Sequence, residues 1–137
     1  MKTTINAYLN FNGNCSEAMS FYQTCFGGEL TLQTVEDSPM AGQWPAQAQQ
    51  NVLHASLVSN DLVLLGSDVG GPDHLIDGNS ISLSITCSSP QEIETFFANL
   101  SDGAKTIMPL HNFFAGIMGH LTDKYGKNWM FYYNSNN

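Results

Sequence analysis

The sequence contains no arginine, and its four lysines face twelve carboxylates, which gives a net charge of −8. A chain this acidic repels phosphate backbones, so we do not expect nucleic acid as a partner. Arginine is also the usual planar clamp for phosphate groups, and its absence disfavours a phosphorylated substrate. The charge indicates solubility first, and it is compatible with a cationic or neutral ligand.

Cysteine pairs with metal-binding or redox spacing are also missing. Cys15, Cys25 and Cys87 form no CxxC motif and are odd in number, which is typical of reduced thiols in a cytoplasmic protein. No apolar run approaches the length of a membrane span. The first ten residues, MKTTINAYLN, lack the apolar core of a signal peptide. We therefore expect a cytoplasmic location and no membrane partner.

The 137 residues, 42% hydrophobic and 12% charged, predict one compact domain. Within it the same order of signals occurs twice: strand, helix and three strands. We place module one at about 1–68, a link at 69–78 and module two at 79–137. Alternation and turn signals predict strands at 3–11, 29–36, 50–58, 62–67, 80–87, 104–108, 113–122 and 127–133.

Each predicted helix has a start signal, an apolar face and a glycine stop. In the first, Asn14 is the expected N-cap with Glu17 completing a capping box, and Gly27-Gly28 ends the helix. Its apolar face comprises Cys15, Ala18, Met19, Tyr22, Cys25 and Phe26. The second begins with Ser89-Pro90-Gln91-Glu92, presents Ile93, Phe96, Phe97 and Leu100, and stops at Asp102-Gly103.

One helix per module cannot cover both faces of eight strands. The fold class that follows is α+β: two βαβββ modules in a cupped, mostly antiparallel eight-stranded sheet, with the helices on the outer face. The polar sides of the first and fifth strands would then point into the cup; these side chains are Asn6, Tyr8, Asn10, Ser80, Ser82 and Ser84. The loop 37–49, with Trp44 at its middle, is either a lid or simply mobile.

This repeat resembles the vicinal oxygen chelate superfamily, which includes glyoxalase I, extradiol dioxygenases and bleomycin-resistance proteins, and it is most similar to the PhnB-like branch. The matching residues are Phe11 to Cys15, Glu17 to Met19, Phe21-Tyr22, Phe26 to Leu30, His54-Ala55, Ser67-Asp68, Met108 to Leu110, Phe113-Phe114, Gly116, Gly119, Thr122 to Gly126 and Trp129-Met130. The resemblance spans essentially the whole chain and implies the cupped fold and a homodimer.

Superfamily enzymes hold a divalent metal through His, Gln or Glu on four strands. Carried over to this chain, those positions fall near Asn6, Leu64 or Leu65, Ser80 and Met130. Leucine, serine and methionine do not fit that site, Asn6 is a poor ligand for transition metals, and the neighbours Ala7, Ser82 and Phe131 are no better. We therefore expect no metal at the usual positions and no resident cofactor, although a divalent metal elsewhere stays open.

PhnB-like proteins are often labelled demethylubiquinone methyltransferases. A Rossmann-type methyltransferase needs a glycine-rich turn between a strand and a helix, within a doubly wound sheet. This sequence has no such turn, so we do not extend the label to it.

Histidines are the candidates for chemistry. His54, in the middle of a predicted strand, and His120 are the candidate catalytic residues, as general acid/base or metal ligand, and His111 is a further site candidate. A structural histidine that is hydrogen-bonded across the sheet explains His54 equally well. His74 lies in the polar link and is expected to be solvated. Asp68 or Glu36 would have to converge with two histidines to complete a metal site.

Aromatic side chains are the candidates for ligand binding: Tyr8, Trp44, Phe113, Phe114 and Trp129, of which Trp129 is better explained as core. Two hypotheses remain. The first is a homodimeric protein that binds a cationic or aromatic small molecule in the cup between the modules, through Asn6, Tyr8, Trp44, His54, Ser80, Ser82, His111, Phe113 and Phe114. The second is a metal-dependent lyase, isomerase or oxygenase with rearranged His ligands. A third possibility is a purely structural dimerisation module.

Overall fold

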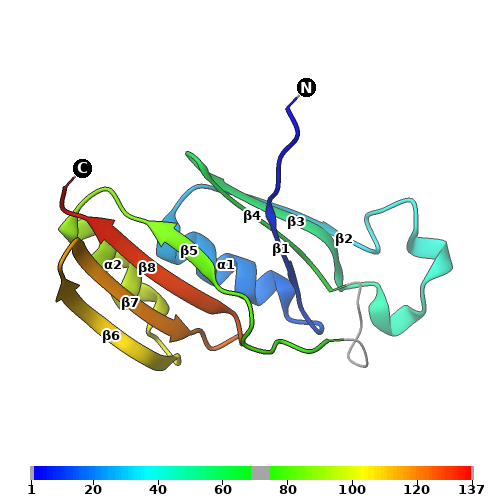
Figure 1. Ribbon diagram of the computed structural model, residues 1–137. Helices are drawn as coiled ribbons and strands as arrows, with labels where there is room; N and C mark the ends of the chain where they lie inside the picture. Colours follow the sequence, from blue (N-terminus) through cyan, green and yellow to red (C-terminus); the bar gives the residue numbers. More distant parts are fainter. Residues whose placement is uncertain (1, 69–74, 137) are drawn as a thin grey trace. The chain divides into compact units, whose positions relative to one another are not determined.

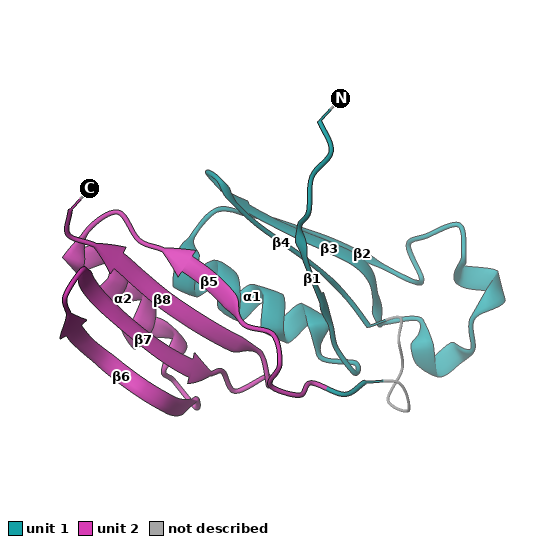
Figure 2. Cartoon of the chain, in the orientation of Figure 1, with its two compact units in different colours: residues 1–76 teal, residues 77–137 magenta. Residues whose placement is uncertain are grey.

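The computed structural model describes residues 2–68 and 75–136, and the chain divides into two compact units, Met1–Ile76 and Asp77–Asn137 (Figure 2). The boundary falls inside the predicted link 69–78, and His74 of that link lies outside the described residues. Among the described residues, no helix has the length and apolar character needed to cross a membrane.

Unit 1 is a four-stranded sheet with one helix. Its elements are β1 (Ala7–Asn10), α1 (Cys15–Phe26), β2 (Glu29–Thr34), two 3-10 turns (Ala41–Gln43 and Ala46–Ala48), β3 (Val52–Ser59) and β4 (Leu62–Ser67). The sheet order is β1-β4-β3-β2. Strand β1 runs parallel to β4, and the other neighbours are antiparallel.

Unit 2 repeats this topology with β5 (Leu83–Thr86), α2 (Pro90–Leu100), β6 (Lys105–Phe113), β7 (Gly116–Thr122) and β8 (Asn128–Asn134) (Figure 1). The sheet order is β5-β8-β7-β6, with β5 parallel to β8 and the other pairs antiparallel. Two βαβββ modules and a mostly antiparallel α+β fold are therefore confirmed.

The apolar face predicted for α1 is confirmed. All six of its members are buried, and the helix contacts β3, β2 and β4. The end of the helix is also as predicted, since Gly27 and Gly28 both have positive φ. Position 28 allows no larger residue, because a Cβ there would lie 2.4 Å from the carbonyl oxygen of Val58.

The cap predicted for α1 is wrong. The Asn14 side chain makes no capping hydrogen bond. The carboxylate of Asp68, at the end of β4, takes its place: Oδ1 accepts from the amides of Gly13 (2.9 Å) and Cys15 (3.0 Å), and Oδ2 accepts from the amide of Val52 (2.9 Å). Asp68 is only 3% exposed and joins α1 to β3 and β4. Among residues 2–68 and 75–136 it belongs to no group of three His, Cys, Asp or Glu side chains that could hold a metal ion.

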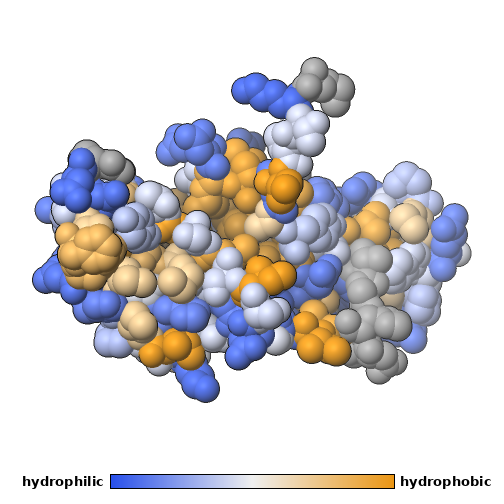
Figure 3. Space-filling view, in the orientation of Figure 1, coloured by the Kyte–Doolittle hydropathy of each residue, from blue (hydrophilic) through white to orange (hydrophobic). Residues whose placement is uncertain are grey.

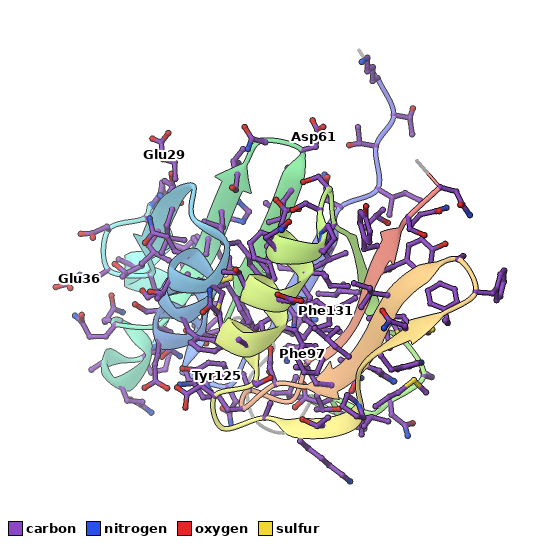
Figure 4. All side chains as sticks on the ribbon, turned by 90° about the vertical axis from the view of Figure 1, so that its left-hand side faces the viewer. Glu29, Glu36, Asp61, Phe97, Tyr125 and Phe131 are labelled. Atoms are coloured by element: carbon purple, nitrogen blue, oxygen red, sulfur yellow. The ribbon has the colours of Figure 1, made fainter. Side chains whose placement is uncertain are left out.

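The start predicted for α2 is confirmed. Ser89 Oγ accepts from the amide of Glu92 at 3.1 Å, and the Glu92 carboxylate accepts from the amide of Ser88 at 2.9 Å. The helix then packs on β8 and β7. Phe97 meets Phe131 edge to face, with the ring centroids 5.1 Å apart (Figure 4).

The two parallel edge strands are shorter than predicted, and Ile5 and Ile81 lie before them. Ile5 is 98% exposed and Ile81 is 77% exposed. Strand β1 pairs with β4 only from Ala7 onward, although position 5 would face Leu62, the first residue of β4. Strand β5 likewise starts opposite Trp129, the second residue of β8.

Strand β6 is longer than predicted and runs through Pro109 to Phe113. An edge strand tolerates proline, whose missing N–H is not needed on its open side. Register shifts between Thr106 and Met108, and between Met108 and His111, place one extra residue in β6 at each point. The segment predicted as one strand over 113–122 is therefore the end of β6, a turn and β7.

Candidate ligand-binding faces

In each unit the helix covers one face of the sheet, and we call the opposite face the open face. In unit 1, a Cβ at Gly66 would lie 3.3 Å from Met19 Sδ of α1, so position 66 faces the helix. Side chains alternate along a strand, so the neighbours of position 66 point the other way. The cross-strand register then gives the open face of unit 1 as Tyr8, Thr31, Gln33, His54, Ser56, Val58, Val63 and Leu65.

Tyr8 and His54 form a pair on this face. The Tyr8 hydroxyl lies 3.3 Å from His54 Nδ1, and the two ring centroids are 5.9 Å apart. The pair spans β4, which lies between β1 and β3. His54 lies in the middle of β3, as predicted, on the side opposite Ala55 and Leu57, whose side chains are both buried. The hydrogen bond across the sheet is the structural alternative to a catalytic His54.

In unit 2, a Cβ at Gly119 would lie 3.0 Å from Phe97 Cε2 of α2, so position 119 faces the helix. Its cross-strand partner Phe131 is fully buried on the same side. The open face of unit 2 therefore carries the alternate residues, which are Ser84, Thr86, Met108, His111, Phe113, Met118, His120, Met130 and Tyr132. In Figure 1 the strands of unit 2 are drawn in front of α2, and Figure 3 shows apolar and polar side chains interspersed over them.

Aromatic rings occupy one end of the open face of unit 2. Phe113 of β6 and Tyr132 of β8 are half-buried, with ring centroids 5.6 Å apart. Phe114 follows at the turn to β7; it is 98% exposed and meets Phe113 edge to face at 5.3 Å. The structure thus brings the two predicted phenylalanines together with Tyr132, which the sequence reasoning did not select.

Histidines and methionines occupy the rest of this face. His120 on β7 lies directly opposite Met130 on β8 and Met108 on β6. Met118, two residues earlier on β7, lies opposite His111 and Tyr132. The three methionines are not among the site residues predicted from the sequence. Alternation along the strands already places Met118 on the same side of β7 as His120, and Met130 on the same side of β8 as Tyr132. Only the residues of β6 that face them could not be predicted from the sequence.

The other predicted site residues are less closely grouped. Asn6 and Ser80 are exposed and precede β1 and β5, so they lie outside the strands that were expected to present them. Ser82 precedes β5 and is half-buried. Trp44 is half-buried in the loop 37–49, where the Gln49 side-chain amide donates to the carbonyls of Ala41 (2.9 Å) and Trp44 (3.0 Å).

Three of the positions carried over from the superfamily's divalent site can be placed on the strands. Leu64 is buried toward α1, Leu65 and Met130 lie on the open faces of their own units, and none of these side chains is a hard or borderline ligand. Among residues 2–68 and 75–136, no three His, Cys, Asp or Glu side chains are grouped so as to hold a metal ion.

Trp129 belongs to the core, as the sequence indicated. It is 1% exposed, and its Nε1 donates to Asp123 Oδ2 at 2.8 Å. Asp123 Oδ1 accepts from the amides of Tyr125 (2.8 Å) and Lys127 (3.0 Å). Unit 2 thus has a buried aspartate whose carboxylate accepts hydrogen bonds from three N–H groups, as the carboxylate of Asp68 does in unit 1.

The strand glycines are explained by close packing within unit 2. A Cβ at Gly116 would lie 1.9 Å from the carbonyl oxygen of Tyr133, and one at Gly119 would meet Leu110 and Phe97. The close neighbours at these two positions are therefore the protein's own β8, β6 and α2.

Comparison with known proteins places the chain. The family model described as 3-demethylubiquinone-9 3-methyltransferase matches residues 3–132. Protein YjdN of Escherichia coli is 29% identical, with 92% of each chain covered. Among solved structures, PA1353 from Pseudomonas aeruginosa is 35% identical with a TM-score of 0.84, covering 97% of this chain and 98% of that one.

A PhnB protein from Bacillus cereus, described as a 3-demethylubiquinone-9 3-methyltransferase, is 27% identical with a TM-score of 0.76, covering 96% of this chain and 99% of its own. A glyoxylase/bleomycin resistance protein/dioxygenase domain from Frankia shares the fold at 14% identity, with a TM-score of 0.64 and 98% of each chain covered. The chain therefore belongs to the PhnB-like family described by that model, and it shares the fold of the glyoxalase/bleomycin resistance/dioxygenase domain.

Proposed function

We propose that this chain is a small-molecule-binding protein whose ligand is aromatic, and a cation in preference to an anion, without the four-ligand divalent metal site of superfamily enzymes. The observation that carries the proposal is the aromatic end of the open face of unit 2. There Phe113 and Tyr132 present rings 5.6 Å apart on a sheet face that α2 leaves uncovered. The ring planes are tilted by 51°, so one ring can stack on a flat ligand while the other contacts its edge.

Charge supports a cationic ligand. The chain has a net charge of −8 and no arginine, so its long-range field attracts cations and repels anions. A cation over an aromatic face gains about 0.5 to 2 kcal/mol in addition to the area that it buries. The open face of unit 1 offers a smaller aromatic pair, Tyr8 with His54, as a second surface of the same kind.

The methyltransferase name of the family does not enter the proposal. The topology of the sheets supports leaving this name out. Each described sheet has three antiparallel strands and one parallel edge strand. A dinucleotide-type cofactor site is built at the carboxyl ends of parallel strands in a doubly wound sheet.

We also propose that the protein is a cytoplasmic homodimer. Exposed apolar side chains support the dimer: Ile5 and Phe114 are each 98% exposed, and Ile81 is 77% exposed. Ile5 and Ile81 flank the edge strands β1 and β5, and open sheet edges are commonly covered by a partner.

A fluorescence titration tests the ligand class. N-methylacridinium is an aromatic cation, and anthracene-9-carboxylate is an anion with a ring system of matching size. We expect the cation to bind at least about fivefold more tightly than the anion, from cation–π attraction and the acidic field. Equal affinity, or preference for the anion, contradicts the proposal.

Two neighbouring tyrosines provide a matched pair of variants that test where the ligand binds. Tyr132→Leu removes a ring from the open face, whereas Tyr133→Leu removes one from the opposite side of the same strand. We expect Tyr132→Leu to weaken acridinium binding about fivefold and Tyr133→Leu to leave it unchanged, since the loss is one ring–cation contact. Equal effects from both variants place the ligand elsewhere and refute the proposed face.

A further inference from the structure

The open face of unit 2 concentrates the soft donor atoms of this chain. Three of the six methionines, Met108, Met118 and Met130, lie on it, together with two of the four histidines, His111 and His120. All five side chains come from three adjacent strands of one unit, and no member is contributed by the helix side of the sheet.

The first row of donors crosses the sheet through His120. Met108 and Met130 are its direct cross-strand partners on β6 and β8. Side chains directly opposite on neighbouring strands have Cβ atoms about 4.5 to 5.5 Å apart. A methionine side chain has three rotatable bonds before its methyl group and bridges that separation easily, so both thioether sulfurs can reach an ion held by the His120 imidazole.

The second row lies next to the first and contains Met118 and His111, which also face each other directly. His111 Nδ1 is 2.9 Å from the carbonyl oxygen of Pro109. A carbonyl oxygen only accepts hydrogen bonds, so Nδ1 carries the ring proton and donates a hydrogen bond to that oxygen. The lone pair of the ring is then on Nε2. A histidine oriented by a backbone carbonyl in this way is typical of metal ligands.

The donor set selects the kind of ion. Thioether sulfur is a soft, neutral ligand that binds Cu(I), and imidazole binds copper as well, whereas Mg, Ca and Mn require oxygen donors. Neutral ligands leave the ion its positive charge, which the net charge of −8 favours. We propose that the open face of unit 2 binds one Cu(I) ion through Met108, Met118, Met130 and His120, with His111 at the edge of the site.

The cysteines do not supply an alternative soft site in the folded chain. Cys15, Cys25 and Cys87 are all buried and are free thiols. Burial, with a smaller contribution from the charge of Glu92, raises the pKa of Cys87 to about 12. Since the thiolate is the metal-binding form, this raised pKa opposes metal binding by Cys87 at neutral pH.

The test uses Ag(I), an air-stable monovalent ion with the same preference for sulfur, and the full chain purified without a histidine tag. The methionine methyl groups are labelled with carbon-13 and followed by NMR. We expect the signals of Met108, Met118 and Met130 to shift together and to saturate at one equivalent of silver. The signal of Met40, an exposed methionine in the loop 37–49, is the internal control and should not move.

Leucine variants then measure the affinity for Cu(I) itself, by competition with a Cu(I) chelator under ascorbate. Met→Leu conserves volume and removes only the sulfur. We expect Met118→Leu, and the double variant Met108→Leu/Met130→Leu, each to weaken binding at least about tenfold, and Met40→Leu to have no effect. The wild-type NMR titration stands even where a variant folds poorly.

Three outcomes overturn the inference: no shift of the three methyl signals, an equal shift of Met40, or protection of the cysteines from alkylation by silver while the methyl signals stay in place. The inference does not rest on the aromatic ligand, since silver binding and acridinium binding are measured separately and either one fails without the other.

Discussion

Asp68 is the polar residue whose replacement should destabilise unit 1 most. Its carboxylate accepts three backbone N–H groups, from Gly13, Cys15 and Val52, at 2.9 to 3.0 Å. Asp68→Asn keeps the size of the side chain and replaces one acceptor oxygen with an NH₂ group. In its better orientation the remaining oxygen faces Gly13 and Cys15, and the NH₂ group opposes the N–H of Val52.

The magnitude follows from these contacts. Leaving the buried Val52 N–H without an acceptor costs about 1 to 3 kcal/mol, and a hydrogen bond to a neutral acceptor is weaker than one to a carboxylate by about 1 kcal/mol. Loss of the negative charge beside the N-terminus of α1 adds about 0.3 to 1 kcal/mol. We expect Asp68→Asn to lower the free energy of unfolding by about 3 kcal/mol.

Urea unfolding followed by circular dichroism measures this loss. With a urea dependence of about 2 kcal/mol per molar, the midpoint should fall by about 1.5 M. The matched control is Asp61→Asn, because Asp61 is exposed at the turn between β3 and β4 and points to solvent (Figure 4). We expect the control to stay within about 0.5 kcal/mol of the wild type. A midpoint for Asp68→Asn equal to that of Asp61→Asn would refute the reasoning.

Two further predictions concern Cys87 and the oligomeric state. The pKa of Cys87 is raised from 9.0 to about 12 in the folded chain, mainly by burial, so the unfolded chain releases this proton first. The free energy of unfolding should therefore fall between pH 9 and 12 more steeply for the wild type than for Cys87→Ala, and parallel urea midpoints in the two proteins would contradict this. Sedimentation should show a homodimer at micromolar concentration. Replacing an exposed apolar side chain at the dimer contact by lysine, as in Ile5→Lys or Phe114→Lys, should shift the equilibrium toward monomer. A wild-type protein that sediments only as monomer rules the dimer out.

The helices could be predicted from the sequence almost residue by residue because their signals are local. Ser89, Pro90 and Glu92 lie within one turn of the α2 start, and the buried face of α1 follows from the helical period alone. The cap of α1 could not be read in this way. Its acceptor, Asp68, is more than fifty positions away along the chain and reaches the helix only once β4 is in place.

The candidate site was predictable along each strand and not across strands. Alternation places His120 and Met118 on one side of β7, and Met130 and Tyr132 on one side of β8. The partners on β6 depend on two bulges around Pro109, which change which residues face Met118 and His120. Phe113 was selected for its type, and its contact with Tyr132 emerged only from the sheet order.

The most direct test of the proposed binding face is to locate bound N-methylacridinium by intermolecular NOEs to the full chain. The account predicts NOEs from the acridinium protons to the rings of Phe113 and Tyr132, which lie on the open face of unit 2. NOEs confined to Tyr133, on the opposite side of β8, or to residues of α2 would contradict it.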